Sequence, residues 1–420
     1  MTDRRAVRAP ALSGLAGALA LLVLIGLALL WPSGDPGPDV PALSSFEGVY
    51  GATTIERTEH ACQGADASTR CFTVTFRLLE GPDEGTDATI ELPANSPRVG
   101  SLTIGRRALL GHQPQVEGFE YVFLEPDRRS PLLALTAIFA LGVVALGRWR
   151  GATALLGLIA TLLVLFLFVV PAILDGRDPL LVSLVGSVVI AFAALYLSHG
   201  VSAQTTIALL GTLGGLLCAA GLAVLFMDAA EISGLASEEA LFLTALGTNL
   251  DLRGLVLGGM MIGALGAIDD ITVTQASAIW ELRAVDPTRS RRDLLRSGMR
   301  IGRAHVASTV NTLVLAYAGA SMPVLILFVL SDQSPSTVAN GEIVATEIVR
   351  TLVGSIGLIA SVPITTWLAV DVVTRRGRHA GGVSAALEVA ENGPEEHAIP
   401  EHRRDVWLGV FRSWRSARRR

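Results

Sequence analysis

Long apolar stretches recur along this chain, and they constrain its fold more than any other feature. A helix needs about 20 apolar residues to cross the hydrocarbon core of a bilayer, which is about 30 Å thick. Several windows of that length contain no charged residue. Charged residues make up 17% of the chain, whereas a soluble domain carries nearer to about 25%. We therefore predict a polytopic α-helical membrane protein.

Eight membrane-spanning helices are predicted from these stretches. A signal peptide is the alternative for the first, because basic residues precede it. Its apolar run of about 20 residues is longer than the usual 7–15 of a signal peptide, so we expect an uncleaved anchor. The predicted spans are Ala11–Trp31, Pro131–Gly147, Ala152–Leu174, Leu180–Ser198, Val201–Met227, Leu252–Glu281, Ala304–Leu330 and Glu342–Val373.

All 33 basic residues are arginine, and the chain contains no lysine. A P-loop ATPase and a pyridoxal phosphate enzyme are therefore excluded, because both need a lysine side chain. Arginines concentrate in cytoplasmic loops. With eight spans every cluster falls on one side, which predicts cytoplasmic termini, and Arg128 and Arg129 are a local exception on the other side. The clusters are Arg4, Arg5 and Arg8; Arg148 and Arg150; the seven arginines from Arg283 to Arg303; and Arg375, Arg376 and Arg378.

The segment 32–130 is expected outside the cytoplasm as a small β-rich domain, either a barrel or a sandwich. Its short runs alternate apolar and polar residues between clusters of Gly, Pro and Asp. Cys62 and Cys71 lie in this segment, and in an oxidising compartment a disulfide is favoured over two free thiols. His60 and His112 are expected on the surface. The predicted strands are Cys71–Leu79, Ala88–Leu92, Ser101–Leu110 and Phe119–Leu124.

The chain is thus divided into four parts: 1–31, a cytoplasmic tip and anchor; 32–130, the β-rich domain; 131–374, a domain of seven helices; and 375–420, a cytoplasmic tail. The composition of the tail predicts disorder up to about Pro400. At its end Trp407, Val410, Phe411 and Trp414 recur at helical spacing among arginines. Residues 403–420 therefore predict an amphipathic helix on anionic inner-leaflet lipids.

Two adjacent aspartates, Asp269 and Asp270, lie inside the sixth span. A carboxylate at this depth costs several kcal/mol, which makes the pair a candidate for transport or ion binding. On an ideal helix Asp269 points about 100° away from Asp270. We therefore favour Asp270, with Thr274 and Ser277 as neutral oxygen ligands. Asp270 shares its face with Gly259, Gly263, Gly266, Thr274, Ser277 and Glu281.

The sixth span is also longer than a membrane requires, because thirty helical residues rise about 45 Å. Two explanations fit the aspartate pair. Either the helix breaks near Gly266–Asp270, as in many secondary transporters, or Asp269 has a partner of its own. Thr272 and Gln275 lie nearer to its side of the helix.

Polar side chains in the last two spans supply further candidates. His305, Asn311 and Thr312 are candidate ligands in the seventh span, although hydroxyl groups more often bond back to their own helix. Glu347 and Arg350 are one turn apart in the eighth span and are expected to form a structural ion pair. A metal site of Asp269, Asp270 and His305 is a weaker alternative, because their spacing matches no metal motif.

Four stretches resemble the motifs of the YibE/F-like family of bacterial multi-pass membrane proteins. They are GALGAIDDITVTQASAIWEL (Gly263–Leu282), NTLVLAYAGASMP (Asn311–Pro323), EIVATEIVRTLVGSIGLIASVPIT (Glu342–Thr365) and TTIALLGTLGG (Thr205–Gly215). In the last, the family often has a lysine before the threonine, where this chain has Gln204 or Thr205. The resemblance covers about Pro131–Asp371 and implies a bacterial plasma-membrane protein with an anchor and an outer β domain. It implies no agreed activity or substrate, and no nucleotide or metal site.

Three functions remain open. The first is a secondary transporter for a small molecule or ion that uses an intramembrane aspartate. The second is a membrane-embedded enzyme, although aspartyl proteases of membranes bring their two aspartates from different spans. The third is a scaffold or regulatory subunit. We expect no cofactor and no nucleic-acid partner, and a homo-oligomer stays open.

Overall fold

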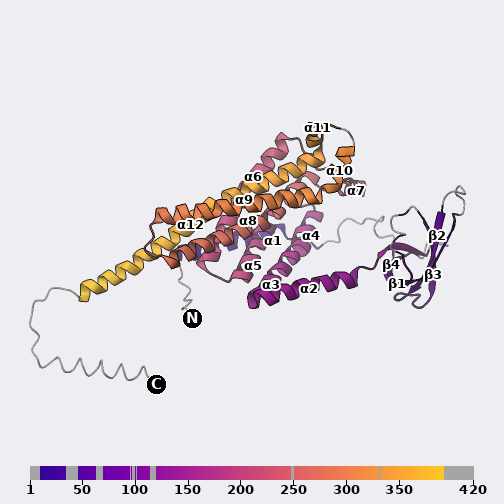
Figure 1. Ribbon diagram of the computed structural model, residues 1–420, viewed down its shortest axis with the longest axis horizontal. Coiled ribbons are helices and arrows are strands. Elements are labelled where there is room, and N and C mark those ends of the chain that lie inside the picture. The colour runs from indigo at the N-terminus through magenta and orange to yellow at the C-terminus, as the bar shows by residue number, and fades with distance from the viewer. Residues whose placement is uncertain are drawn as a thin grey trace, which may run out of the picture.

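A computed structural model of the chain describes residues 10–34, 46–62, 70–94, 96, 100, 102–113, 120–246, 250–330 and 333–391. These residues form a strand domain and a bundle of helices, which follow one another along the long axis of the molecule (Figure 1). Arg4, Arg5, Arg8 and the predicted amphipathic helix at 403–420 lie outside the described residues. The architecture confirms a polytopic helical protein with a β-rich domain.

The strand domain is a single antiparallel sheet that curls into a half-barrel. Its five strands lie in the order β3-β2-β1-β4-β5. The inner face is apolar, and Phe76, Leu110 and Phe123 are almost completely buried in it. On the outer rim, Arg77 donates two hydrogen bonds to Asp87, and this contact holds the pKa of Asp87 below its usual value. The strands are β1 Gly48–Ala61, β2 Arg70–Leu78, β3 Asp87–Pro93, β4 Arg107–His112 and β5 Tyr121–Pro126.

The central strand, β1, is absent from the predicted strands. It is the longest strand, with 14 residues, and it pairs with β2 on one side and β4 on the other. Its inward positions include the small residues Ala52 and Thr54, both fully buried. Small and polar inward residues give a weak alternating signal, so the strand is hard to detect. β4 also begins at Arg107 instead of Ser101.

The helical part begins with α1 and resumes after the strand domain. By length and apolar composition, six of the described helical segments can cross a membrane, and α9 with α10 would make a seventh, bent by 63°. The apolar part of α1, Gly14–Leu30, is shorter. Eight crossings therefore stay a prediction. The elements are α1 Pro10–Leu30, α2 Arg129–Gly147, α3 Trp149–Val164, the π-helical segment η2 Leu165–Val169, α4 Val170–Leu174, α5 Pro179–His199, α6 Ala203–Ala229, α7 Glu238–Ala245, α8 Leu252–Val285, α9 Arg291–Ala320, α10 Met322–Leu330, α11 Pro335–Asn340 and α12 Glu342–Glu391.

The predicted arginine loop between the sixth and seventh spans is mostly helical. α9 begins at Arg291, well before the predicted start at Ala304. Ser290 caps it, because its hydroxyl accepts a hydrogen bond from the backbone N–H of Asp293 (3.2 Å). An apolar window marks where a helix meets the membrane, whereas the cap marks where the helix begins.

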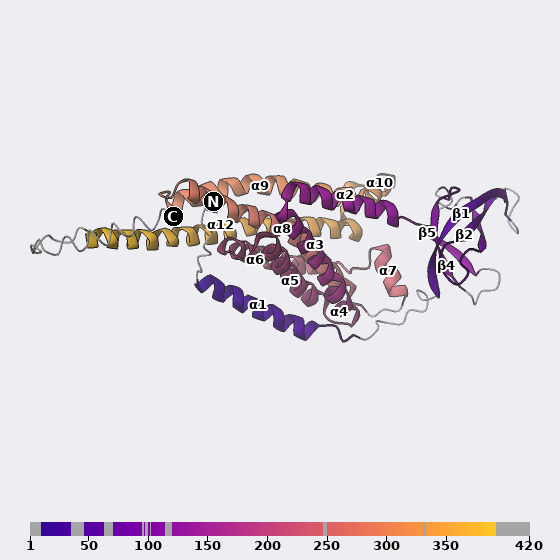
Figure 2. The same cartoon turned by 90° about the horizontal axis from the view of Figure 1, so that it is seen from below.

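Neighbouring spans run in opposite directions through the bundle. Gln204 near the start of α6 bonds Ser277 late in α8, and Thr212 further along α6 bonds the earlier Asp269. The arginine-bearing turn between α8 and α9 and the late part of α12 therefore lie at the same end, away from the strand domain (Figure 2). Two of the four arginine clusters thus lie at one end of the bundle, and the cytoplasmic position of that end stays a prediction.

The last helix is longer than predicted. α12 runs unbroken for 50 residues to Glu391, where the composition of the tail predicts disorder. At 1.5 Å per residue it is about 75 Å long, so it extends far beyond a bilayer core of about 30 Å. Helix-forming Ala, Leu and Glu residues in its final turns account for the difference.

Candidate functional site

The two aspartates of α8 lie in different environments. The helix is continuous from Leu252 to Val285, so it does not break at the aspartates. Asp269 is partly buried on the side of α6, whereas Asp270 is exposed. Of the two explanations from the sequence, the second is therefore correct: Asp269 has a partner of its own.

That partner is a pair of buried threonines at the contact between α6 and α8. Thr212 and Thr272 are both fully buried, and their hydroxyl oxygens are 2.7 Å apart. The Thr272 hydroxyl donates to the backbone carbonyl of Asp269 (2.9 Å), and the Thr212 hydroxyl donates to the Asp269 carboxylate at 3.4 Å.

The hydroxyl protons in this cluster are too few for its acceptors. Two protons, one from each threonine, serve three oxygens: the Asp269 carbonyl, the Thr272 hydroxyl and the Asp269 carboxylate. The carboxylate takes the longest of these bonds. A buried carboxylate needs strong donors to offset its desolvation, so this group is suited to receive a proton or a cation.

A close crossing of α6 and α12 lies next to the cluster and contacts α8 through Ile268. A side chain added at Gly215 would meet the Gly357 carbonyl oxygen at 2.8 Å, and one added at Gly357 would meet the Gly215 carbonyl at the same distance. Ile268, the residue before Asp269, packs against both glycines. Small residues at this crossing let three helices approach each other at the level of the aspartate.

Gln275 joins three helices about two turns beyond Asp269 on α8. It is fully buried, and its amide nitrogen donates to the Gly298 carbonyl of α9 (2.9 Å) and to the Thr366 hydroxyl of α12 (2.7 Å). Its side-chain oxygen is buried without a hydrogen-bond partner among the described residues. These contacts make Gln275 a connector of helices.

The face that the sequence favours, the one with Asp270, is largely exposed. Gly259, Gly263, Gly266 and Thr274 are exposed along with the aspartate. The Thr274 hydroxyl donates to the Asp270 carbonyl (3.0 Å) within its own helix. Ser277 is the exception, because its hydroxyl accepts a hydrogen bond from Gln204 of α6 (2.6 Å).

The candidates on α9 do not join the aspartate cluster. Asn311 and Thr312 are exposed, and the Thr312 hydroxyl donates to the Ser308 carbonyl of its own helix (3.1 Å). His305 is partly buried, and its Nδ1 atom has no hydrogen-bond partner among the described residues. Within that part of the chain, Asp269, Asp270 and His305 do not gather closely enough to hold a metal ion.

Two predicted structural contacts are confirmed. Arg350 and Glu347 form an ion pair of 3.5 Å along α12. Cys62 and Cys71 form a disulfide in the strand domain. Ser33, shortly after the end of α1, donates hydrogen bonds from its backbone and side chain to Asp175 after α4. These bonds lower the pKa of Asp175.

The sequence places Thr272 on the Asp269 side of α8 and shows polar residues on α6, among them Thr212, but it does not pair Thr212 with Asp269 and it passes over Thr366. Thr212, Thr272 and Thr366 all contact a candidate residue, and each lies in an apolar helix where a threonine usually bonds to its own backbone. The signal that could have found Thr212 is its position among the glycines of the stretch Gly211–Gly215, because small residues mark a helix contact.

A model of the YibE/F-like protein family matches residues 135–375, more than half of the chain. The chain belongs to the YibE/F-like family. The matched range contains Asp269, Thr212 and Gln275 with their partners, whereas the strand domain lies before it. No curated protein and no solved structure matches this YibE/F-like chain.

Proposed function

We propose that the protein is a secondary transporter in the bacterial plasma membrane, and that the carboxyl group of Asp269 is its coupling site. The observation that supports this function is the partly buried carboxylate at the contact of α6 and α8, which among the described residues receives one long hydrogen bond, from Thr212. Ionisable groups within membrane spans mark proton and ion pathways in transporters. A proton or a monovalent cation would complete the interactions of Asp269.

The surroundings of Asp269 favour transport over peptide-bond hydrolysis. The adjacent carboxylate, Asp270, lies on the exposed face of α8 and not beside Asp269 at the contact with α6. An aspartyl protease needs two carboxylates that share one proton. No residue of the described helices supplies the second carboxylate at this position.

The orientation of the transporter follows from its arginines. The turn between α8 and α9 and the late part of α12 share one end of the bundle and carry many of them. We place this end in the cytoplasm, by the positive-inside rule, and the strand domain outside.

The proposal is tested with Asp269→Asn in proteoliposomes, where asparagine keeps the shape of the side chain and removes its charge. Charge movement after a pH jump is measured by electrometry on a solid-supported membrane. We expect Asp269→Asn to abolish this movement and Asp270→Asn to retain most of it. Wild-type movement in Asp269→Asn would refute the proposal.

A second measurement needs no substrate. Dicyclohexylcarbodiimide is an apolar reagent that modifies protonated carboxyl groups within membranes. We expect one modification per wild-type chain, none in Asp269→Asn and one in Asp270→Asn, as read by intact-protein mass spectrometry. If Na⁺ at constant pH protects Asp269 from modification, Asp269 binds a cation. Acidity alone is not expected to protect it, because the reagent modifies the protonated carboxyl group.

A further inference from the structure

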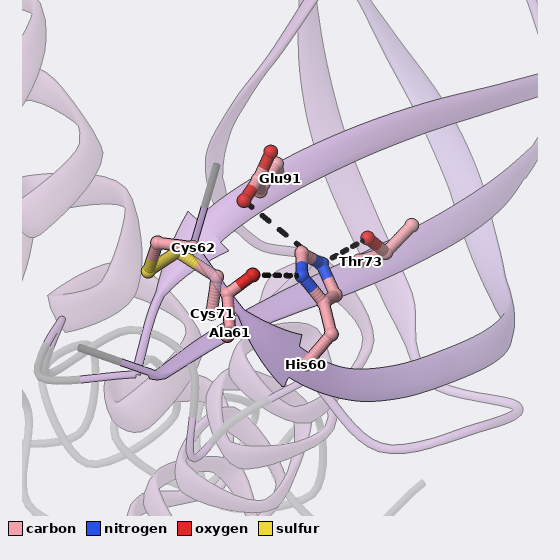
Figure 3. The surroundings of a disulfide bond; sticks show 6 residues. All are labelled: His60, Ala61, Cys62, Cys71, Thr73 and Glu91. Atoms are coloured by element: carbon pink, nitrogen blue, oxygen red, sulfur yellow. Dashed lines mark hydrogen bonds and ion pairs between the residues drawn. A yellow bond between two sulfur atoms is a disulfide. The ribbon is translucent and has the colours of Figure 1, made fainter. Parts of the chain in front are cut away.

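Three potential metal ligands lie together at one corner of the strand domain, and His60 lies beside one of them (Figure 3). The sulfur atoms of Cys62 and Cys71 and a carboxylate oxygen of Glu91 all lie within 4.8 Å of one another. The Nε2 atom of His60 lies 3.9 Å from a Glu91 carboxylate oxygen. These residues come from β1, β2, β3 and the residue that follows β1.

The strand register brings His60, Cys71 and Glu91 together, and the disulfide adds Cys62. His60 of β1 is paired with Cys71 of β2, and Cys71 with Pro93 of β3. Glu91 is paired with Thr73, two residues along β2 from Cys71. Because residues two apart on a strand share a face, His60, Cys71 and Glu91 lie on the same face of the sheet. The gathering thus rests on backbone pairing and not on the disulfide alone.

His60 is already oriented like a metal ligand. Its Nδ1 atom lies 2.8 Å from the Ala61 carbonyl oxygen. A carbonyl only accepts hydrogen bonds, so Nδ1 carries a proton. When the ring is neutral, the Nε2 atom therefore accepts a hydrogen bond from the Thr73 hydroxyl (2.6 Å), which a cation at Nε2 would displace, and a Glu91 carboxylate oxygen lies 3.9 Å away. Metal-bound histidines have this same arrangement, with the other ring nitrogen donating to a carbonyl or carboxylate.

We propose that this corner is a redox-controlled site for a divalent cation of the zinc class. A dithiol reductant supplies two electrons and two protons to the Cys62–Cys71 bond and becomes a disulfide itself. The two thiols then lose their protons as they bind the cation, with His60 and Glu91 as the third and fourth ligands. The oxidised form, with its sulfur atoms bonded to each other, does not bind the cation.

The ligand set favours zinc over harder cations. Two thiolates, one imidazole and one carboxylate satisfy a tetrahedral ion, and thiolates select zinc against magnesium and calcium. Glu91 is exposed, and His60 and Cys62 are partly exposed, so a reductant and a cation can both reach the corner. The site lies outside the helices and does not depend on transport through Asp269.

The test compares the oxidised and reduced full-length protein in detergent after removal of any affinity tag. A phosphine reductant is used, and Zn²⁺ binding is measured by competition with a chromophoric chelator. We expect one Zn²⁺ per reduced chain, bound at least about 100-fold more tightly than by the oxidised chain. Co²⁺ in place of Zn²⁺ is expected to show sulfur-to-metal charge-transfer absorption. Equal affinity of the two redox forms would overturn the proposal.

Four variants separate the ligands from the fold. Cys62→Ser should weaken the charge-transfer absorption, because one of the two thiolates is lost, and His60→Ala and Glu91→Gln should keep it while weakening Zn²⁺ binding about tenfold or more. The matched control is Glu59→Gln, because Glu59 is the preceding residue of β1, on the opposite face, and pairs with Arg70 (3.3 Å). We expect no change in its Zn²⁺ affinity. If Glu59→Gln weakens Zn²⁺ binding as much as the ligand variants do, the proposed site is also overturned.

Reduction itself can loosen the strand domain, so stability is followed in parallel. A cation that binds only the folded form raises the melting temperature. We expect Zn²⁺ to raise the melting temperature of the reduced wild type and to leave that of the Cys62→Ser and Cys71→Ser double variant unchanged. A rise in the double variant would show that Zn²⁺ binds elsewhere.

Discussion

At the scale of single residues, two adjacent aspartates have opposite surroundings. One step along a helix turns the side chain by about 100°, which takes Asp269 to the contact with α6 and leaves Asp270 exposed. Sequence periodicity predicts this separation correctly. It does not predict which of the two faces is covered by another helix, because both faces carry small or polar residues.

Gln275 provides a residue-scale prediction. Gln275→Leu keeps the size of the side chain but removes the hydrogen bonds to Gly298 and Thr366. Interhelical hydrogen bonds in membranes contribute roughly 0.6–1.7 kcal/mol each, so we expect the free energy of unfolding to fall by about 1–3 kcal/mol. Thermal unfolding in detergent measures the change.

The matched control for this prediction is Thr274→Val on the adjacent position of α8. Thr274 is exposed and bonds to its own helix, so its loss should leave the melting temperature nearly unchanged. If both variants melt at the wild-type temperature, Gln275 does not hold the three helices together.

At the scale of elements, the bundle is organised around the crossing of α6 and α12. Each of Gly215 and Gly357 faces the backbone of the other helix, and Ile268 of α8 packs into the same contact. On α12 the small residues Gly354, Gly357 and Ser361 follow at helical spacing in the sequence. Their partner is not visible there, because α6 carries glycines on more than one face.

The crossing gives a second prediction. Gly215→Leu places a side chain against the Gly357 carbonyl and Ser361, each 2.8 Å from the added carbon. Overpacking costs about 1–3 kcal/mol or more, so we expect a lower melting temperature and a smaller yield of folded protein. The control is Gly221→Leu on the same helix, where nothing lies within 4 Å. Equal loss in both variants would contradict a specific crossing.

At the scale of the whole molecule, the apolar windows predict the helices well and the remaining elements less well. Each predicted span is mainly helical among the described residues, although Ala304–Leu330 is interrupted at Ser321 between α9 and α10, with a bend of 63°. β1 escapes prediction because its inward residues are small, and α9 begins early because a polar cap lies outside the membrane window. α12 continues into a segment of mixed composition. The partner of Asp269 could not be predicted, since helix contacts depend on rotations that one sequence does not encode in its periodicity.

Orientation is the whole-molecule prediction. Single cysteines are introduced at Thr288 in the turn between α8 and α9 and at Ser336 in α11, after Cys218→Ser removes the free thiol. We expect Ser336→Cys to react with an impermeant maleimide in intact cells. Thr288→Cys should react only after the membrane is opened. The reverse pattern would invert the proposed topology.

The shortage of protons around Asp269 has a consequence for communication between helices. While the carboxyl is charged, the Thr212 hydroxyl donates its proton to the Asp269 carboxylate. A carboxyl that gains a proton can donate to Thr212 instead, which frees the threonine proton to turn towards Thr272. The rotation of one hydroxyl group on α6 would then report the charge state of α8, with no displacement of either backbone.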